Sequence, residues 1–241
     1  MRYFILLFFF GAFTIQAQNK GLINDQMLWG GYYNSISFNT KLSLNSDLQE
    51  RTKDWYKQWS QVLVRTGLNY KINDRLSVTA GLADFLFFGK NNLPERNEKR
   101  IWEEISFTQA FPKLKFNNRL RTEQRFFKNI ENGKESGAVT EFYRFRYKIE
   151  LQIPMKEKLT LVGGNEFMLN TKPDFVLFFF DQNRVYAGIN TKLNDKLMLQ
   201  LQLMLVQQKT TNNSPINQTF VIRLNLYHTI KLKHKDDSSA K

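Results

Sequence analysis

Arginines recur at short, even spacings in two neighbouring stretches of the chain, and they are the side chains with the clearest chemical potential. Arg119, Arg121 and Arg125 lie in the first stretch, and Arg144 and Arg146 lie in the second. Residues i and i+2 of a β-strand share one face, so each stretch would present its arginines on one wall. Buried charges without partners cost several kcal/mol each, so this wall must pair with carboxylates, stay hydrated or hold an anion.

Carboxylates on the same faces could neutralise part of this positive wall. Glu123 and Glu150 alternate with the arginines, and Glu104 lies in the preceding segment. We therefore predict a charge network in the interior of the protein: Arg119, Arg121, Glu123, Arg125, Arg144, Arg146, Glu150 and Arg184. Two interpretations follow from these residues: a hydrated ion-pair network that fills the interior, or an interior that binds or conducts small anions.

The stretches that carry these residues alternate between apolar and polar side chains with a period of two, which is typical of β-strands. In the second stretch, Phe145 and Tyr147 lie between Arg144, Arg146 and Lys148. Segments of this kind follow one another along the chain: residues 26–38, 40–51, 58–72, 75–88, 100–111, 113–127, 139–153, 158–170, 181–193, 196–208 and 218–232. No helical period appears after the N-terminal segment, so we predict an all-β protein.

The connections between these segments alternate between short and long. Tight turns are predicted at Asn73, Pro112, Pro154 and Asn194, and longer loops are predicted to begin at Gly89, Lys128, Thr171 and Lys209. All prolines fall between the predicted strands, where a missing amide costs no hydrogen bond of the sheet. This rhythm predicts an up-and-down antiparallel transmembrane β-barrel of roughly 10–12 strands. An even number is expected, because both ends of such a barrel lie on the periplasmic side.

Aromatic residues gather near the ends of the predicted strands, as expected for the girdles where a barrel meets the two membrane interfaces. Trp59, Phe87 and Trp102 lie toward the long loops, and Tyr70 and Phe111 lie toward the short turns. This placement favours a barrel whose apolar face contacts lipid and whose arginines point into the lumen.

The N-terminus has the pattern of a secretory signal peptide. Arg2 precedes an apolar run over residues 3–13, and Ala17 is a small residue suited to cleavage. The run is too short for a transmembrane helix of about 20 residues. We predict a signal peptide over residues 1–17, a single transmembrane barrel domain over 18–232 and a charged tail over 233–241.

Export of a barrel predicts the outer membrane as the location of the protein. Outer-membrane lipid is then its expected partner, with a small anion as a candidate ligand in the lumen. We expect the protein to be a monomer. We also expect it to bind no nucleic acid, although its net charge is +13, because an exported chain does not meet nucleic acid and this sequence has no nucleic-acid-binding motif.

The chain lacks the residue pairs that hydrolytic enzymes need. It has no cysteine and two histidines, of which His228 lies on the lipid-facing side of its segment and His234 lies in the tail. No GxSxG, HExxH or phosphate-loop motif occurs. We therefore expect no enzyme, cofactor or metal, and instead a structural or small-anion-binding barrel of unknown molecular activity. A narrow anion-selective pore is the main alternative, and a lipid-modifying enzyme is a weaker one.

Several pieces of the sequence together resemble a known family. They are the segment around Trp29, DLQER at 47–51, RTGLNYKINDRLSVTAGL at 65–82, RLRTEQRF at 119–126, RFRYKIEL at 144–151 and QNRVYAGI at 182–189. They are similar to the outer-membrane β-barrel family catalogued as domain of unknown function 2490, and RLRTEQRF followed by RFRY is the most specific part. The resemblance implies an exported outer-membrane barrel with no established activity, so it bears on location rather than on catalysis.

Overall fold

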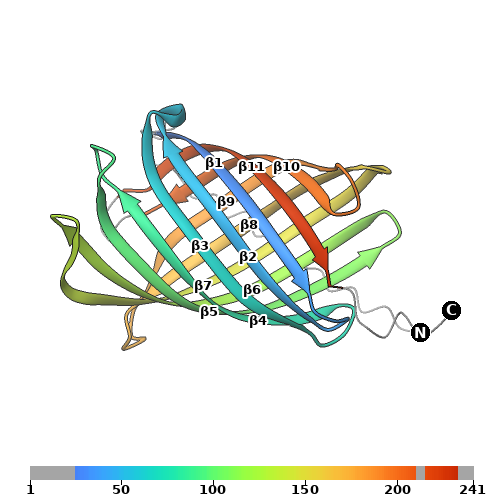
Figure 1. Ribbon diagram of the computed structural model, residues 1–241, viewed down its shortest axis with the longest axis horizontal. Coiled ribbons are helices and arrows are strands. Elements are labelled where there is room, and N and C mark those ends of the chain that lie inside the picture. The colour runs from blue at the N-terminus through green and yellow to red at the C-terminus, as the bar shows by residue number, and fades with distance from the viewer. Residues whose placement is uncertain (1–24, 210–214, 233–241) are drawn as a thin grey trace.

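The computed structural model describes residues 25–209 and 215–232, which form a closed β-barrel (Figure 1). Its strands are β1 (Asp25–Ser37), β2 (Leu42–Lys53), β3 (Gln58–Lys71), β4 (Leu76–Phe88), β5 (Pro94–Phe111), β6 (Leu114–Glu131), β7 (Lys134–Lys156), β8 (Leu159–Thr171), β9 (Phe178–Lys192), β10 (Leu197–Gln208) and β11 (Asn217–Lys231). One turn of 3-10 helix, η1 (Asp54–Tyr56), joins β2 to β3. The predicted signal peptide and charged tail lie outside the described residues. In the described part of the chain, no helix is long and apolar enough to cross a membrane.

Strands that follow one another in the sequence pair antiparallel, and the barrel closes through a parallel pair between β1 and β11. This seam runs from Asp25 opposite Thr219 to Ser37 opposite Lys231. The all-β barrel and the predicted range of strand numbers are confirmed. The expectation of an even number is wrong, because a parallel seam lets the eleven described strands close. Consequently β1 begins at the long-loop end of the barrel and β11 ends at the other.

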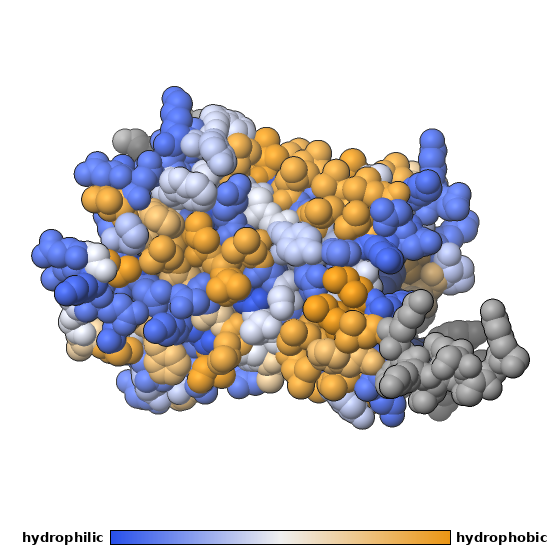
Figure 2. Space-filling view, in the orientation of Figure 1, coloured by the Kyte–Doolittle hydropathy of each residue, from blue (hydrophilic) through white to orange (hydrophobic). Residues whose placement is uncertain are grey.

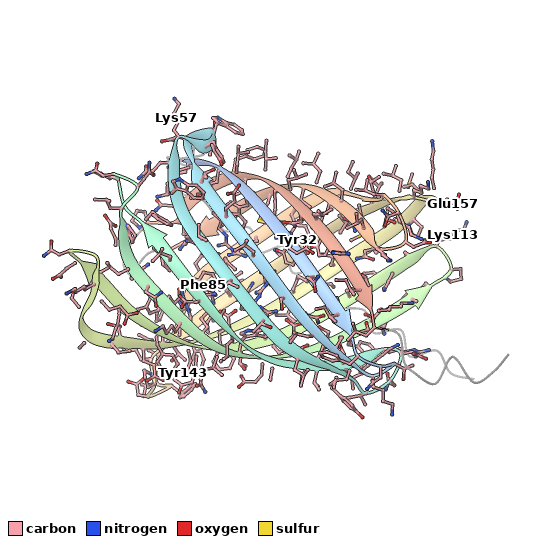
Figure 3. All side chains as sticks on the ribbon, viewed as in Figure 1. Tyr32, Lys57, Phe85, Lys113, Tyr143 and Glu157 are labelled. Carbon is pink, nitrogen blue, oxygen red and sulfur yellow. The ribbon has the colours of Figure 1, made fainter. Side chains whose placement is uncertain are left out.

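The two ends of the barrel differ in their connections. Lys57, between β2 and β3, marks the long-loop end, and Lys113 and Glu157, in the β5–β6 and β7–β8 turns, mark the opposite end (Figure 3). The β6–β7 hairpin projects beyond the long-loop end (Figure 1). The barrel is therefore a cylinder with a longer wall on one side.

The projecting hairpin corrects one predicted loop. The sequence predicts a long loop from Lys128, but β6 continues to Glu131 and β7 begins at Lys134. Asn132 and Gly133 make the turn with φ angles of 52° and 76°, as in the two-residue turns that match the twist of a hairpin. The residues on either side of this turn are polar because the hairpin extends past the barrel, not because they lack strand pairing.

Two prolines also lie inside strands, contrary to the expectation. Pro94 is the first residue of β5, and Pro154 lies in β7 next to a register shift. A strand tolerates proline at its first residue and at a bulge, where no ladder hydrogen bond needs its amide.

The outer face of the barrel is apolar and the inner face is polar. Leu48, Val64, Leu82 and Leu203 point outward and are each more than half exposed, whereas inward Gln202 is fully buried. Figure 2 shows apolar residues across the wall and hydrophilic residues gathered toward the two ends of the cylinder. A soluble barrel has the opposite distribution, with apolar side chains inside. The predicted orientation of the two faces is confirmed.

Small apolar clusters fill parts of the interior. One contains Trp29, Val162, Tyr186, Met204, Val206 and Val221, and the other contains Leu63, Ala83, Phe85 and Trp102. The assignment of Phe87 and Trp102 to an interfacial girdle is therefore wrong, since Trp102 is 4% exposed and Phe87 packs against its cluster. Trp102 shares its face of β5 with inward Arg100 and Glu104, and this alternation outweighs the general preference of tryptophan for interfaces.

Gly67 leaves room for the Trp102 ring, because a Cβ atom at Gly67 would lie 2.5 Å from Trp102 Cζ2. We expect Gly67→Ala to lower the free energy of unfolding by about 1–3 kcal/mol through overpacking. Urea unfolding of the barrel in detergent measures the change. Gly163→Ala is the matched control, since its Cβ would meet only ordinary contact at 3.7 Å. Equal effects of the two variants would contradict this account of the packing.

Candidate functional site: the charge network and cavity of the lumen

Glu123 of β6 is the hub of an ion-pair network in the lumen. Its Oε1 accepts a hydrogen bond from Arg146 Nη1 at 2.6 Å, and its Oε2 accepts one from Arg144 Nε at 2.8 Å. Arg100 Nη1 approaches Oε2 at 3.3 Å, and Arg121 Nη1 lies 3.9 Å from Oε1. Glu123 is 2% exposed, so one carboxylate serves several guanidinium groups away from bulk water.

A second carboxylate extends the network toward the long-loop end. Glu98 is fully buried. Its carboxylate accepts hydrogen bonds from Arg100 Nε at 2.5 Å and from Arg100 Nη2 at 2.8 Å. Arg125 Nε donates to the same carboxylate at 2.6 Å. Arg144, besides its bond to Glu123, pairs with Asp181 at 3.1 Å. These fork-like pairs are the strong form of a guanidinium–carboxylate contact.

Two further carboxylates extend the network toward the short-turn end. Glu104 accepts a hydrogen bond from Arg121 Nε at 2.7 Å and pairs with Arg119 Nε at 3.4 Å. Glu166 of β8 accepts a hydrogen bond from Arg146 Nη2 at 2.7 Å. It also forms ion pairs with Arg119 and, at 3.5 Å, with Arg184 Nη1. The shared carboxylates link strands β5 to β9 across the lumen.

The structure brings most of the predicted network together and separates one member. Arg119, Arg121, Glu123, Arg125, Arg144, Arg146 and Arg184 are linked through shared carboxylates or, for Arg125, through Glu98 and Arg100. Glu150 lies apart, where it accepts hydrogen bonds from Tyr186 at 2.7 Å, Gln152 at 2.9 Å and Lys148 at 3.4 Å. It pairs with lysine and tyrosine rather than with the arginines it was expected to compensate.

Sequence reasoning missed three members of the network: Glu98, Arg100 and Asp181. Residues 89–99 contain a proline and many polar side chains, which predict a loop, yet β5 begins at Pro94. Glu98, Arg100 and Glu104 lie at even spacings on one strand. Extending the period-two pattern of this segment toward the proline would have found the first two residues.

A cavity of about 360 Å³ lies beside the network. Arg96, Gln182 and Gln208 line it toward the long-loop end, and Gln152 and Met198 line it toward the short-turn end. Basic side chains in its lining far outnumber the acidic ones, which are Glu150, Glu166 and Asp181. The lumen is thus partly filled by ion pairs and partly an elongated, positively charged space. Among the described residues, no cluster of three or more His, Asp or Glu side chains could hold a metal ion.

A closed barrel with an apolar outer face and a charged interior defines an up-and-down β-barrel of the transmembrane class. Within that class, the chain belongs to the family described as "Protein of unknown function (DUF2490)", whose profile matches residues 26–217. The family resemblance predicted from the sequence is confirmed.

Individual proteins and solved structures share low sequence identity with this chain. The chain is 25% identical to an uncharacterized protein of Methylorubrum extorquens, over 85% of this chain and 88% of the relative. Among solved structures, it is similar to the NanC porin, with 13% identity, a TM-score of 0.42 and coverage of 79% of this chain and 92% of that one. The β-domain of the Bordetella autotransporter BrkA shows 8% identity, a TM-score of 0.43 and coverage of 76% and 82%.

Proposed function

We propose that this protein is an outer-membrane β-barrel whose lumen binds small anions. The apolar outer face supports the membrane location, since a chain with this surface would aggregate in water. The excess of arginine over carboxylate in the lining of the 360 Å³ cavity is the observation that supports the ligand class. A positively charged, partly dehydrated space concentrates anions, because charges interact more strongly there than in bulk water.

A narrow anion-selective pore is a second candidate function. One observation favours it: residues near both ends of the barrel line the same cavity, including Gln208 and Met198 at opposite ends of β10. An anion that enters from one mouth would then meet guanidinium groups along its path to the other. The ion-pair network on β5 to β9 would narrow that path.

Fractionation and conductance test both functions together. The purified protein should come from the outer-membrane fraction and show heat-modifiable gel mobility, as expected for a folded barrel. Saturable anion binding with an electrically silent bilayer supports the binding barrel. A steady anion-selective current supports the pore. Recovery from a soluble periplasmic fraction, or turnover of a labelled membrane lipid, would overturn the proposal.

A further inference from the structure

The charges of the lumen are unevenly distributed around the barrel. Most of the carboxylates that neutralise the arginines lie on β5, β6, β8 and β9; Asp47 of β2 pairs with Arg65 at 2.8 Å, and β10 and β11 contain no acidic residue. Arg223 of β11 and Arg51 of β2 point into the cavity on the side opposite Glu123. Within the described residues, neither of these arginines forms an ion pair; they bond only to glutamine side chains.

The parallel seam makes the two arginines neighbours. Trp29 of β1 lies opposite Arg51 in one strand pair and opposite Arg223 in the other. Neighbouring strands are about 4.8 Å apart, so the two arginine backbones lie roughly 10 Å apart with the indole between them. Arg51 stacks 4.1 Å from the centroid of the Trp29 ring, and Arg184 reaches in from β9 to 5.2 Å.

Three buried hydrogen-bond donors at and next to Arg51 and Arg223 have no acceptor among the described residues. Arg51 Nε, Arg223 Nε and Gln202 Nε2 are buried and unpaired. Gln202 is fully buried, and its Oε1 accepts a hydrogen bond from Arg223. In the same way, Gln61 Oε1 accepts a hydrogen bond from Arg51 Nη1 at 2.9 Å. Buried donors are normally satisfied, and Arg51 and Arg223 both line the cavity, so an anion that enters the cavity would meet their free Nε groups. The glutamines already fix the guanidinium groups, so little further ordering would be needed for a ligand to bind.

We propose that the Arg51–Trp29–Arg223 row binds a small organic carboxylate. A guanidinium group matches the two oxygens of a carboxylate with parallel N–H donors. Aromatic rings offer a flat surface for the organic part: Tyr33 and Tyr227 stack with centroids 4.7 Å apart, and both line the cavity. This site deepens the proposed anion-binding function and rests on it. It differs from the Glu123 network, whose arginines already have carboxylate partners.

Titration of the purified full-length barrel in detergent tests the site, with benzoate and inorganic phosphate as probes at constant ionic strength. Wild type should bind benzoate saturably and more tightly than phosphate. Arg51→Gln and Arg223→Gln should each weaken benzoate binding roughly tenfold, the loss expected for one hydrogen bond to a charged group. Arg75→Gln, in the exposed β3–β4 turn, removes the same charge outside the lumen and should bind as wild type does. Heat-modifiable mobility checks that each variant is folded.

The outcomes separate this site from the general proposal. If neither probe binds wild type, both the site and the anion-binding function are overturned. If anions bind but Arg51→Gln and Arg223→Gln bind benzoate as tightly as wild type, the site alone is overturned. Tighter binding of phosphate than of benzoate would overturn the choice of an organic carboxylate.

Discussion

Replacing Glu123 with glutamine should destabilise the barrel by about 3–5 kcal/mol, the cost of breaking a buried ion pair by removing one partner. Glutamine keeps the shape of the side chain but removes the charge that faces Arg144, Arg146, Arg100 and Arg121. The guanidinium groups would then repel one another in a site that is almost closed to water. Equilibrium unfolding by urea in detergent micelles, followed by tryptophan fluorescence, measures the loss.

Glu135→Gln is the matched control for this charge removal. Glu135 lies on the projecting hairpin, and its side chain is 37% exposed. It pairs with Lys99 of β5 at 3.6 Å and with Lys128 of β6 at 3.4 Å. Exposed pairs of this kind contribute about 0–1 kcal/mol. The double variant Glu123→Gln/Arg146→Gln should recover part of the loss, because it removes one of the unbalanced cations while Glu166 keeps Arg119 and Arg184 as partners. If Glu123→Gln were as mild as Glu135→Gln, the arginines would not depend on this carboxylate, and a bound anion would become the better account of their balance.

The alternation of side chains predicted which residues enter the lumen, because a strand allows only two faces. Gln202 and Leu203 are adjacent in β10, yet one is fully buried and the other is 52% exposed. A shift of one residue would exchange these environments along the whole strand, so a long alternating segment admits a single orientation. The arginines of β6 and β7 follow the same rule, and this part of the site could be read from the sequence.

The alternation of side chains does not predict which inward-facing residues of different strands lie at the same level along the barrel axis. Glu150 shares its face of β7 with Arg144, but six residues separate them, which is about 20 Å along a strand. Glu150 therefore meets Tyr186 instead of the arginine cluster. Membership of one face is a weaker condition than contact, and the tilt and register of the closed barrel decide which of the inward charges meet.

Closure of the barrel was also beyond local patterns. The pairing of β1 with β11 joins the first and last described strands, and no turn or spacing between them indicates whether they run parallel. The same closure creates the Arg51–Trp29–Arg223 row from residues far apart in the sequence. A period-two pattern predicts that these side chains point inward, but only the seam makes them neighbours.

The membrane location predicts a depth-dependent cost on the outer face of β10. Leu203 lies near the middle of this strand and points outward. Leu203→Arg should raise the free energy of the folded state in lipid by roughly 2–4 kcal/mol, because the guanidinium would sit near the bilayer midplane. Reversible folding of the urea-unfolded protein into phospholipid vesicles measures this difference.

Leu193→Arg provides the control, since it places the same charge on a leucine of nearly equal exposure in the β9–β10 turn. Leu193 is 49% exposed and Leu203 is 52% exposed, so their surroundings differ chiefly in distance from the end of the barrel. Near the interface the same substitution should cost only about 0–1 kcal/mol. In water, both leucines would be ordinary surface residues, and both changes would stay within about 0.5 kcal/mol of wild type. Equal, small effects at the two positions would therefore remove the lipid-facing assignment of this wall and with it the membrane location.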